Sequence, residues 1–192
     1  MAAKTESTFL NMVITLFVVT AVAGLALGSV YNFTKEPIEI AKQKKLTKAI
    51  TAVLPAFDSI EEKMVQEANG TESLAFYVAT KDSLLIGTAV STYTMKGFSG
   101  LIQLMVGFLP DGSIHNISVI EHKETPGLGT KMKDAKFKDQ FIGKNPANFN
   151  LKVTKDKGEV DAITAATISS RAFSDAVQRA YDTFEKNKGG NE

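Results

Sequence analysis

A run of apolar residues from Phe9 to Tyr31 constrains this chain more than any other feature of its sequence. The run contains no charged residue, and its few polar residues are asparagine, threonine and serine. About 20 consecutive residues of this kind form a helix that crosses the hydrocarbon core of a bilayer. We therefore predict a transmembrane helix over residues 9–31, preceded by a short flank over residues 1–8.

A cleaved signal peptide is the alternative, because Lys4 precedes the run and Ala21 to Ala23 resemble a cleavage site. The run is longer than a signal-peptide core and continues past those alanines, which favours a retained anchor. The flanking charges bear on the orientation of this anchor in the membrane. Lys35 and the lysines between Lys42 and Lys45 follow the run, so the positive-inside rule alone would place the remaining chain in the cytoplasm.

Composition excludes several classes of function. The 192 residues include 22 basic and 21 acidic side chains, giving a formal charge of +1, so no basic excess indicates nucleic acid. The chain has no cysteine, which excludes disulfides, thiolate catalysis and cysteine-ligated metals. The two histidines, His115 and His122, are seven residues apart on or beside one predicted strand, too far apart to form a tight metal pair. We predict no metal site.

The remaining sequence predicts one α+β domain, an antiparallel sheet with flanking helices. Residues 32–73 read as a helical linker and the start of the soluble domain, residues 74–187 as its main part, and residues 188–192 as a tail. Apolar periodicity separates helices from strands. It predicts helices over residues 39–54, 134–142 and 171–186. It also predicts strands over residues 74–80, 84–94, 101–108, 114–120 and 149–154. The strands 101–108 and 114–120 form a hairpin around Pro110.

The segment from Asp161 to Ser170 reads DAITAATISS and opens directly into the last predicted helix. Small residues surround Thr167, so its hydroxyl lies on a backbone with little side-chain bulk. Helix N-termini present unpaired N–H groups and a positive partial charge, which suits a phosphate. The alternative is a plain helix cap, since serine and threonine are good capping residues.

Two further segments have the composition of ligand-binding loops. The first runs from Glu124 to Gly129, reads ETPGLG, directly follows a predicted strand and is followed by Lys131. Its glycines let the backbone approach a flat ligand closely. The second is Gly97-Phe98-Ser99-Gly100, between two predicted strands. Each segment alone also fits an ordinary turn.

In this order, the three segments resemble the FMN-binding domain found in the G subunit of Rnf/Rsx complexes and in the C subunit of the sodium-pumping NADH:quinone reductase. The resemblance implies that Thr167 carries FMN through a phosphoester bond and that the Glu124–Gly129 loop lines the isoalloxazine ring. Many members have glycine where Ala165 stands. The cofactor-binding residues implied, besides Thr167, are Asp161, Thr164, Ala165, Ala166, Ser169, Ser170, Glu124, Thr125, Pro126, Gly127, Leu128, Gly129, Lys131, Gly97, Phe98 and Gly100.

The resemblance also implies a function. The chain would relay electrons within an ion-translocating ferredoxin:NAD⁺ oxidoreductase, beside other redox subunits and membrane lipid, with its domain outside the cytoplasm and its anchor in the inner membrane. A separate flavin transferase would attach the FMN from FAD, so we predict no catalytic residue in this chain. The alternatives are the equivalent subunit of the quinone reductase and a membrane-anchored binding module without a redox cofactor.

Overall fold

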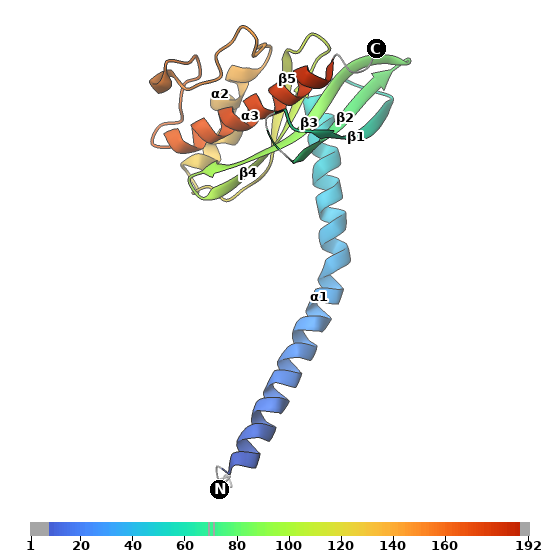
Figure 1. Cartoon of the computed structure of the whole chain (residues 1–192), viewed down its shortest axis with the longest axis vertical. Coiled ribbons are helices and arrows are strands. Elements are labelled where there is room, and N and C mark those ends of the chain that lie inside the picture. Colours follow the sequence, from blue (N-terminus) through green and yellow to red (C-terminus); the bar gives the residue numbers. More distant parts are fainter. Residues whose placement is uncertain (1–7, 69, 71, 189–192) are drawn as a thin grey trace. The chain divides into compact units, whose positions relative to one another are not determined.

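The computed structural model describes residues 8–68, 70 and 72–188 and divides the chain into two compact units, Met1–Lys44 and Lys45–Glu192. The predicted N-terminal flank and C-terminal tail lie almost wholly outside the described residues. In the second unit, helices and an antiparallel sheet form a single α+β arrangement, which confirms the predicted fold class (Figure 1).

A single helix, α1 (Phe9–Val53), contains both of the N-terminal segments that the sequence predicts as helical. It continues through Pro37, which removes one N–H donor without ending the helix. The helix is long and apolar enough to cross a membrane, and its apolar stretch is not buried by any other described part of the chain. These exposed side chains indicate a membrane anchor, because water is an unfavourable neighbour for so large an apolar surface.

Five strands form one sheet in sequence order, and each strand pairs antiparallel with the next. The strands are β1 (Ser59–Gln66), β2 (Ser73–Lys81), β3 (Leu84–Gly97), β4 (Gly100–Phe108) and β5 (Ile114–His122). The four strands predicted from residue 74 to residue 120 are confirmed, as is the hairpin between β4 and β5. Strand β1 was not predicted, because this edge strand is exposed and reads SIEEKMVQ, without a buried alternation.

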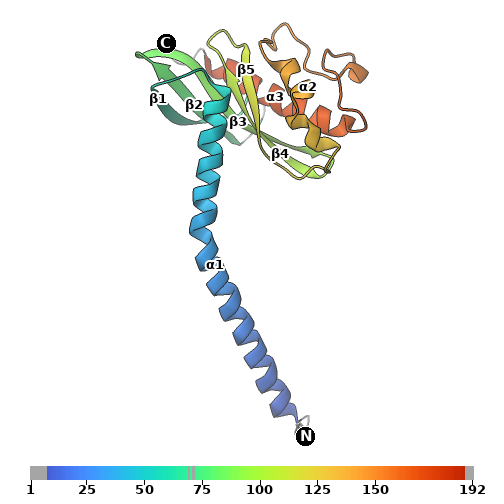
Figure 2. The same ribbon diagram turned by 180° about the vertical axis from the view of Figure 1, so that it is seen from behind.

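Helix α3 (Thr167–Lys188) packs along one face of the sheet, as Figures 1 and 2 show from opposite sides. Its apolar stripe is buried, and Phe173 and Val177 contribute to the same core as Leu104 and Phe108 of β4. Burying each such side chain stabilises the fold by about 1.5–3 kcal/mol. The helix begins four residues before the predicted start at residue 171, so Thr167 lies in its first turn.

The opposite face of the sheet packs against the end of α1 that belongs to the second unit. Ile50 and Val53 are buried there against Tyr77 and Met105. A side chain at Gly107 would collide with the carbonyl oxygen of Val53, so only glycine allows the helix to approach β4 this closely. The sheet therefore has a helix on each face.

The connection between β5 and α3 contains only short helical pieces. They are η1 (Gly129–Lys133), α2 (Ala135–Lys138), η2 (Asp139–Phe141) and η3 (Thr154–Asp156). The helix predicted over residues 134–142 is thus α2 followed by η2. The strand predicted over residues 149–154 is wrong: Val153 makes one isolated bridge, to Val160, because the left-handed backbone of Lys157 reverses the chain after η3.

Candidate functional site

A tight turn places Thr167 at the start of α3. The amide of Ala166 donates a hydrogen bond to the carbonyl of Ile163 at 2.9 Å, and Ala165, at the third position of this turn, has a φ of 60°. Turns of this kind favour glycine at that position. The hydroxyl of the fully buried Ser170 accepts from the Ile163 amide at 2.9 Å and donates to the Ala166 carbonyl at 3.0 Å. The helix itself therefore fixes the turn.

A buried carboxylate joins the three predicted segments. Glu124, 4% exposed, accepts a hydrogen bond from the Ser99 amide at 2.9 Å and a short one from the Ser169 hydroxyl. A Cβ at Gly97 or Gly129 would lie 2.7 Å or 2.6 Å from the carboxylate oxygens, so the side chain fills the space those glycines leave. The sequence predicted that these segments meet, but not that Glu124 is the residue that joins them.

These segments enclose a cavity of about 310 Å³, which we call the Thr167 cavity. Its apolar rim consists of Phe98, Leu128 and Ile168, which are 68%, 40% and 48% exposed. Ligand sites usually combine an apolar lining with a few polar groups in volumes of about 300–1,000 Å³. The lining, drawn from all three segments, is Phe98, Glu124, Thr125, Leu128, Gly129, Ala165, Ala166, Thr167, Ile168 and Ser169.

The remaining predicted site residues lie elsewhere. Asp161, Thr164 and Lys131 line a second cavity of about 560 Å³, the Asp161 cavity, together with further polar side chains such as Gln140. The backbone of Asp161 is held there, because its amide donates to the Gln140 side chain at 2.7 Å and its carbonyl accepts from that side chain at 3.2 Å.

Turn residues account for the other predicted positions. Gly100 and Gly127 have φ of 95° and 76°, so each occupies a turn conformation that favours glycine. The Gly127 amide donates to the Thr130 hydroxyl at 2.9 Å, which closes the loop after the exposed Pro126. Neither Gly97, Gly100, Pro126 nor Gly127 lines the Thr167 cavity, and these residues shape the loops that do.

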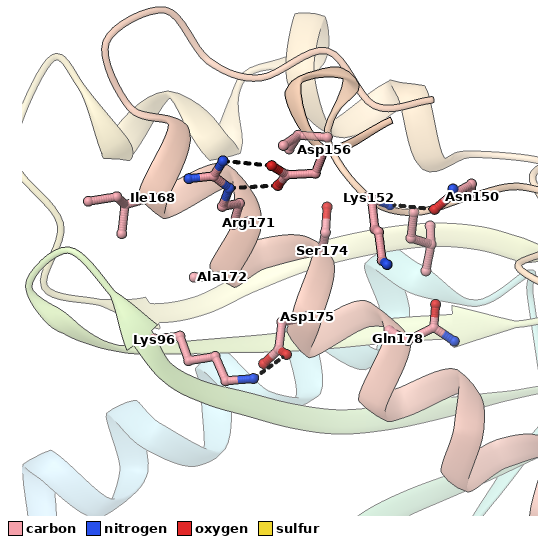
Figure 3. A pocket seen from close by; sticks show the side chains of 12 residues that line it. Lys96, Asn150, Lys152, Asp156, Ile168, Arg171, Ala172, Ser174, Asp175 and Gln178 are labelled. Atoms are coloured by element: carbon pink, nitrogen blue, oxygen red, sulfur yellow. Dashed lines mark hydrogen bonds and ion pairs between the residues drawn. The ribbon is translucent and has the colours of Figure 1, made fainter. Parts of the chain in front are cut away.

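One contact at Thr167 was not predicted from the sequence. The ammonium of Lys155, on η3, donates a hydrogen bond to the Thr167 hydroxyl at 3.3 Å. The neighbouring Asp156 forms two hydrogen bonds with the guanidinium of Arg171 on α3, at 2.6 Å and 2.7 Å (Figure 3). Hydrogen bonding to Arg171 lowers the pKa of Asp156 below its ordinary value, and the same contact raises the pKa of Arg171.

A third cavity, of about 580 Å³, lies beside this ion pair, and its lining includes Lys96, Lys152 and Ser174 (Figure 3). Ile168 lines both this cavity and the Thr167 cavity. The buried Ser174 hydroxyl has no hydrogen-bond partner in the part of the chain that the structure describes. No sequence pattern indicated this cavity, because α3 and the part of the preceding connection that contains Lys152 meet only in the folded chain.

His122 supports the loop that carries Glu124. Its Nδ1 accepts a hydrogen bond from the Glu124 amide at 3.2 Å, so that nitrogen carries no proton in this arrangement. Desolvation is the largest cause that lowers the pKa of His122 from its ordinary value of 6.5, and Lys133 lowers it further, while Glu124 acts in the opposite direction. The folded structure therefore favours the neutral imidazole.

Comparison with known proteins gives consistent results. Residues 97–182, which include every residue lining the Thr167 cavity, match the family model described as FMN-binding domain. The chain is 32% identical to the G subunit of the ion-translocating oxidoreductase complex of Methanosarcina acetivorans, over 93% of this chain and 96% of that protein. It is also 32% identical to the G subunit of the Na⁺-translocating ferredoxin:NAD⁺ oxidoreductase complex of Acetobacterium woodii, over 88% of each chain.

Two further likenesses were found. The G subunit of the proton-translocating ferredoxin:NAD⁺ oxidoreductase complex of Clostridium ljungdahlii is 31% identical, over 94% of this chain and 91% of that protein. The crystal structure of Shewanella oneidensis NqrC superposes with a TM-score of 0.47 and 23% identity, over 74% of this chain and 72% of that one. From the sequence relatives and the domain match together, the chain belongs to the G-subunit family of ion-translocating oxidoreductase complexes and contains an FMN-binding domain.

Proposed function

We propose that this protein carries FMN bound covalently to Thr167 and relays electrons within a membrane-bound, ion-translocating ferredoxin:NAD⁺ oxidoreductase complex. The observation that carries the proposal is the position of the Thr167 hydroxyl. It lies in the first turn of α3, partly exposed, and lines a cavity with an apolar rim. A hydroxyl in that place can hold a phosphate while the cavity receives a flat apolar ring.

The residues of the site fit the two ends of FMN. The N-terminus of α3 and the Lys155 ammonium provide positive charge where a phosphate on Thr167 would lie. Phe98, Leu128 and Ile168 provide apolar surface for the isoalloxazine. When bound, FMN supplies the capacity to accept and donate electrons, and the protein supplies attachment, orientation and electrostatics.

The membrane anchor supports the location of the domain among other subunits of such a complex. We propose that the domain lies outside the cytoplasm, where a covalent bond prevents loss of the cofactor by diffusion. The lysines at 42–45, which oppose this orientation by charge, lie within α1 rather than in a loop. The positive-inside rule applies to loop charges near the ends of a span, so these helical lysines weigh less.

The test is the intact mass of the denatured protein after co-expression with a flavin transferase. Wild type should gain the mass of FMN less water, and Thr167→Ala should gain nothing. Thr164→Ala is the matched control: Thr164 lines the Asp161 cavity, so this variant should gain the same mass as wild type. Both variants should remain folded, because a partly exposed hydroxyl contributes little to stability.

The outcomes separate the alternatives. Loss of the label in Thr164→Ala but not in Thr167→Ala would move the attachment to Thr164. No mass gain in wild type, with a transferase that modifies a control substrate, would favour a binding module without a redox cofactor. Co-purification of the tagged, flavin-loaded protein with the other components of a quinone reductase, instead of a ferredoxin-dependent complex, would assign the chain to that complex.

A further inference from the structure

The Lys155 ammonium is held next to the hydroxyl that the proposed function assigns to FMN. Its Nζ donates to the Thr167 hydroxyl at 3.3 Å, and among the described residues it has no other hydrogen-bond or ion-pair partner. A neutral hydroxyl satisfies little of the charge on an ammonium group. The contact therefore leaves a cation at Thr167 that an anion attached there would pair with.

The adjacent ion pair explains why Lys155 is directed toward Thr167. Asp156 is the nearest carboxylate along the chain, and the Arg171 guanidinium engages both of its oxygens. Bidentate pairs of this kind are geometrically specific, so Asp156 is not a competing partner for the lysine. The Asp156–Arg171 pair, which Figure 3 shows, joins η3 to α3. Because η3 contains Lys155 and α3 begins at Thr167, this pair holds the backbone of the lysine near Thr167.

We propose that Lys155 assists the attachment of FMN to Thr167 and afterwards pairs with the phosphodiester that results. This inference rests on the proposed function and adds a role for a residue of this chain. In the attachment, a bond forms between Thr167 Oγ1 and the FMN-side phosphorus of FAD. The anhydride P–O bond breaks, AMP leaves with the bonding electron pair, and the hydroxyl proton passes to a base on the transferase.

The geometry suits this role because the ammonium donates to Oγ1 and leaves the hydroxyl's own proton free to depart. As that proton departs, negative charge develops on Oγ1, and a donor already in place stabilises it without rearrangement. The product carries one negative charge beside the same ammonium. Losing one charge-assisted hydrogen bond of this kind corresponds to a change of about 10- to 100-fold in rate.

The experiment measures attachment directly on the full-length protein in detergent. Purified flavin transferase and FAD are added, and intact mass is followed over time at several concentrations of the acceptor protein. Lys155→Gln should lower the rate at saturating acceptor about tenfold or more. Lys155→Arg, which restores a donor cation, should recover most of that rate. Lys157→Gln is the matched control, because Lys157 is an exposed lysine of the same loop without a hydrogen bond to Thr167.

The results distinguish this inference from the proposed function. If Lys155→Gln loads as fast as wild type while Thr167→Ala does not load, the role of Lys155 is refuted and the attachment site stands. If Lys155→Gln raises only the KM for the acceptor, the lysine serves transferase docking and the inference fails. Equal slowing in Lys157→Gln would also overturn it. An unchanged melting temperature for Lys155→Gln, with slow loading and rescue by arginine, supports it.

Discussion

The Thr167 cavity and the Asp161 cavity lie on either side of one short turn but differ in chemistry. The first has an apolar rim and is built from three distant segments. In the second, most of the lining residues are charged or polar, including Lys131, Asp134 and Lys136. Residues that are contiguous in the motif are divided between them, with Thr164 in one and Thr167 in the other. A sequence motif therefore need not correspond to one surface, and the functions of its two halves can be tested separately.

The two cavities should differ most in how much the removal of one carboxylate side chain destabilises the fold, and Glu124 should have the larger effect. Glu124→Ala leaves the Ser99 amide and the Ser169 hydroxyl without their acceptor in the Thr167 cavity. We expect the free energy of unfolding to fall by about 1–3 kcal/mol, because a buried donor without a partner, here the Ser169 hydroxyl, costs about that much, whereas the amide of the exposed Ser99 can bond to water. Urea denaturation of wild type and variant measures this.

Asp161→Ala, in the other cavity, is the control for Glu124→Ala. The Asp161 side chain is exposed, and the hydrogen bonds at this position involve its backbone. Its removal should change the free energy of unfolding by no more than about 0.5 kcal/mol. Similar losses in the two variants would contradict the view that Glu124 joins the segments of the site.

The parts of the fold that could be predicted share a physical signal. Strands β2 to β5 and the stripe on α3 bury apolar side chains at a regular spacing, and that spacing is visible in the sequence. Strand β1 is exposed and polar, so no such signal exists. The segment at residues 149–154 looked like a strand because of Leu151 and Val153, which are buried, but its path is set by a left-handed turn at Lys157.

The candidate site likewise has parts that could be predicted from the sequence and parts that could not. Its three segments were predicted, since each carries a local motif. The contacts that organise them were not, because they join residues far apart in sequence through side-chain geometry. Glu124 bonds to Ser169, 45 residues away, and Lys155 reaches Thr167 only because the chain reverses between them. Such pairings have no period in the sequence.

Ala165 offers a smaller test at the boundary between the two cavities. Its φ of 60° is a left-handed conformation that costs a residue with a Cβ about 1–2 kcal/mol. Ala165→Gly should remove that cost, which the greater flexibility of unfolded glycine partly offsets. We expect a net gain in stability of about 0.5–1 kcal/mol, measured as a rise in the urea midpoint. FMN loading should remain complete.

The matched control for Ala165→Gly is Ala162→Gly, which alters a residue of the Asp161 cavity with a negative φ. There the substitution removes no strain and only increases the freedom of the unfolded chain. Stability should fall by about 0.4–1 kcal/mol. If both glycine variants were destabilised equally, the turn before α3 would not be strained.

The smallest expected effect is the dependence of stability on pH, and it again concerns only the Thr167 cavity. Burial and Lys133 lower the pKa of His122 below 6.5, and its unprotonated Nδ1 accepts from the Glu124 amide. As the pH falls, the unfolded chain therefore takes up a proton at this residue at a higher pH than the folded chain does. This contribution to stability is fully present above pH 6.5 and is lost as the pH falls below 6.5 toward the lowered pKa of the folded state.

His122→Asn should remove this contribution, since an amide oxygen can accept the same hydrogen bond without titrating. Melting temperatures of the two full-length proteins are measured in detergent between about pH 7.5 and 5.5. As the pH falls, the melting temperature of wild type should decrease more than that of His122→Asn. His115→Asn, which alters the only other histidine, should follow wild type. Parallel curves for wild type and His122→Asn would show that protonation of His122 does not weaken the support of the Glu124 loop, and the pH sensitivity of the site would then have to arise elsewhere.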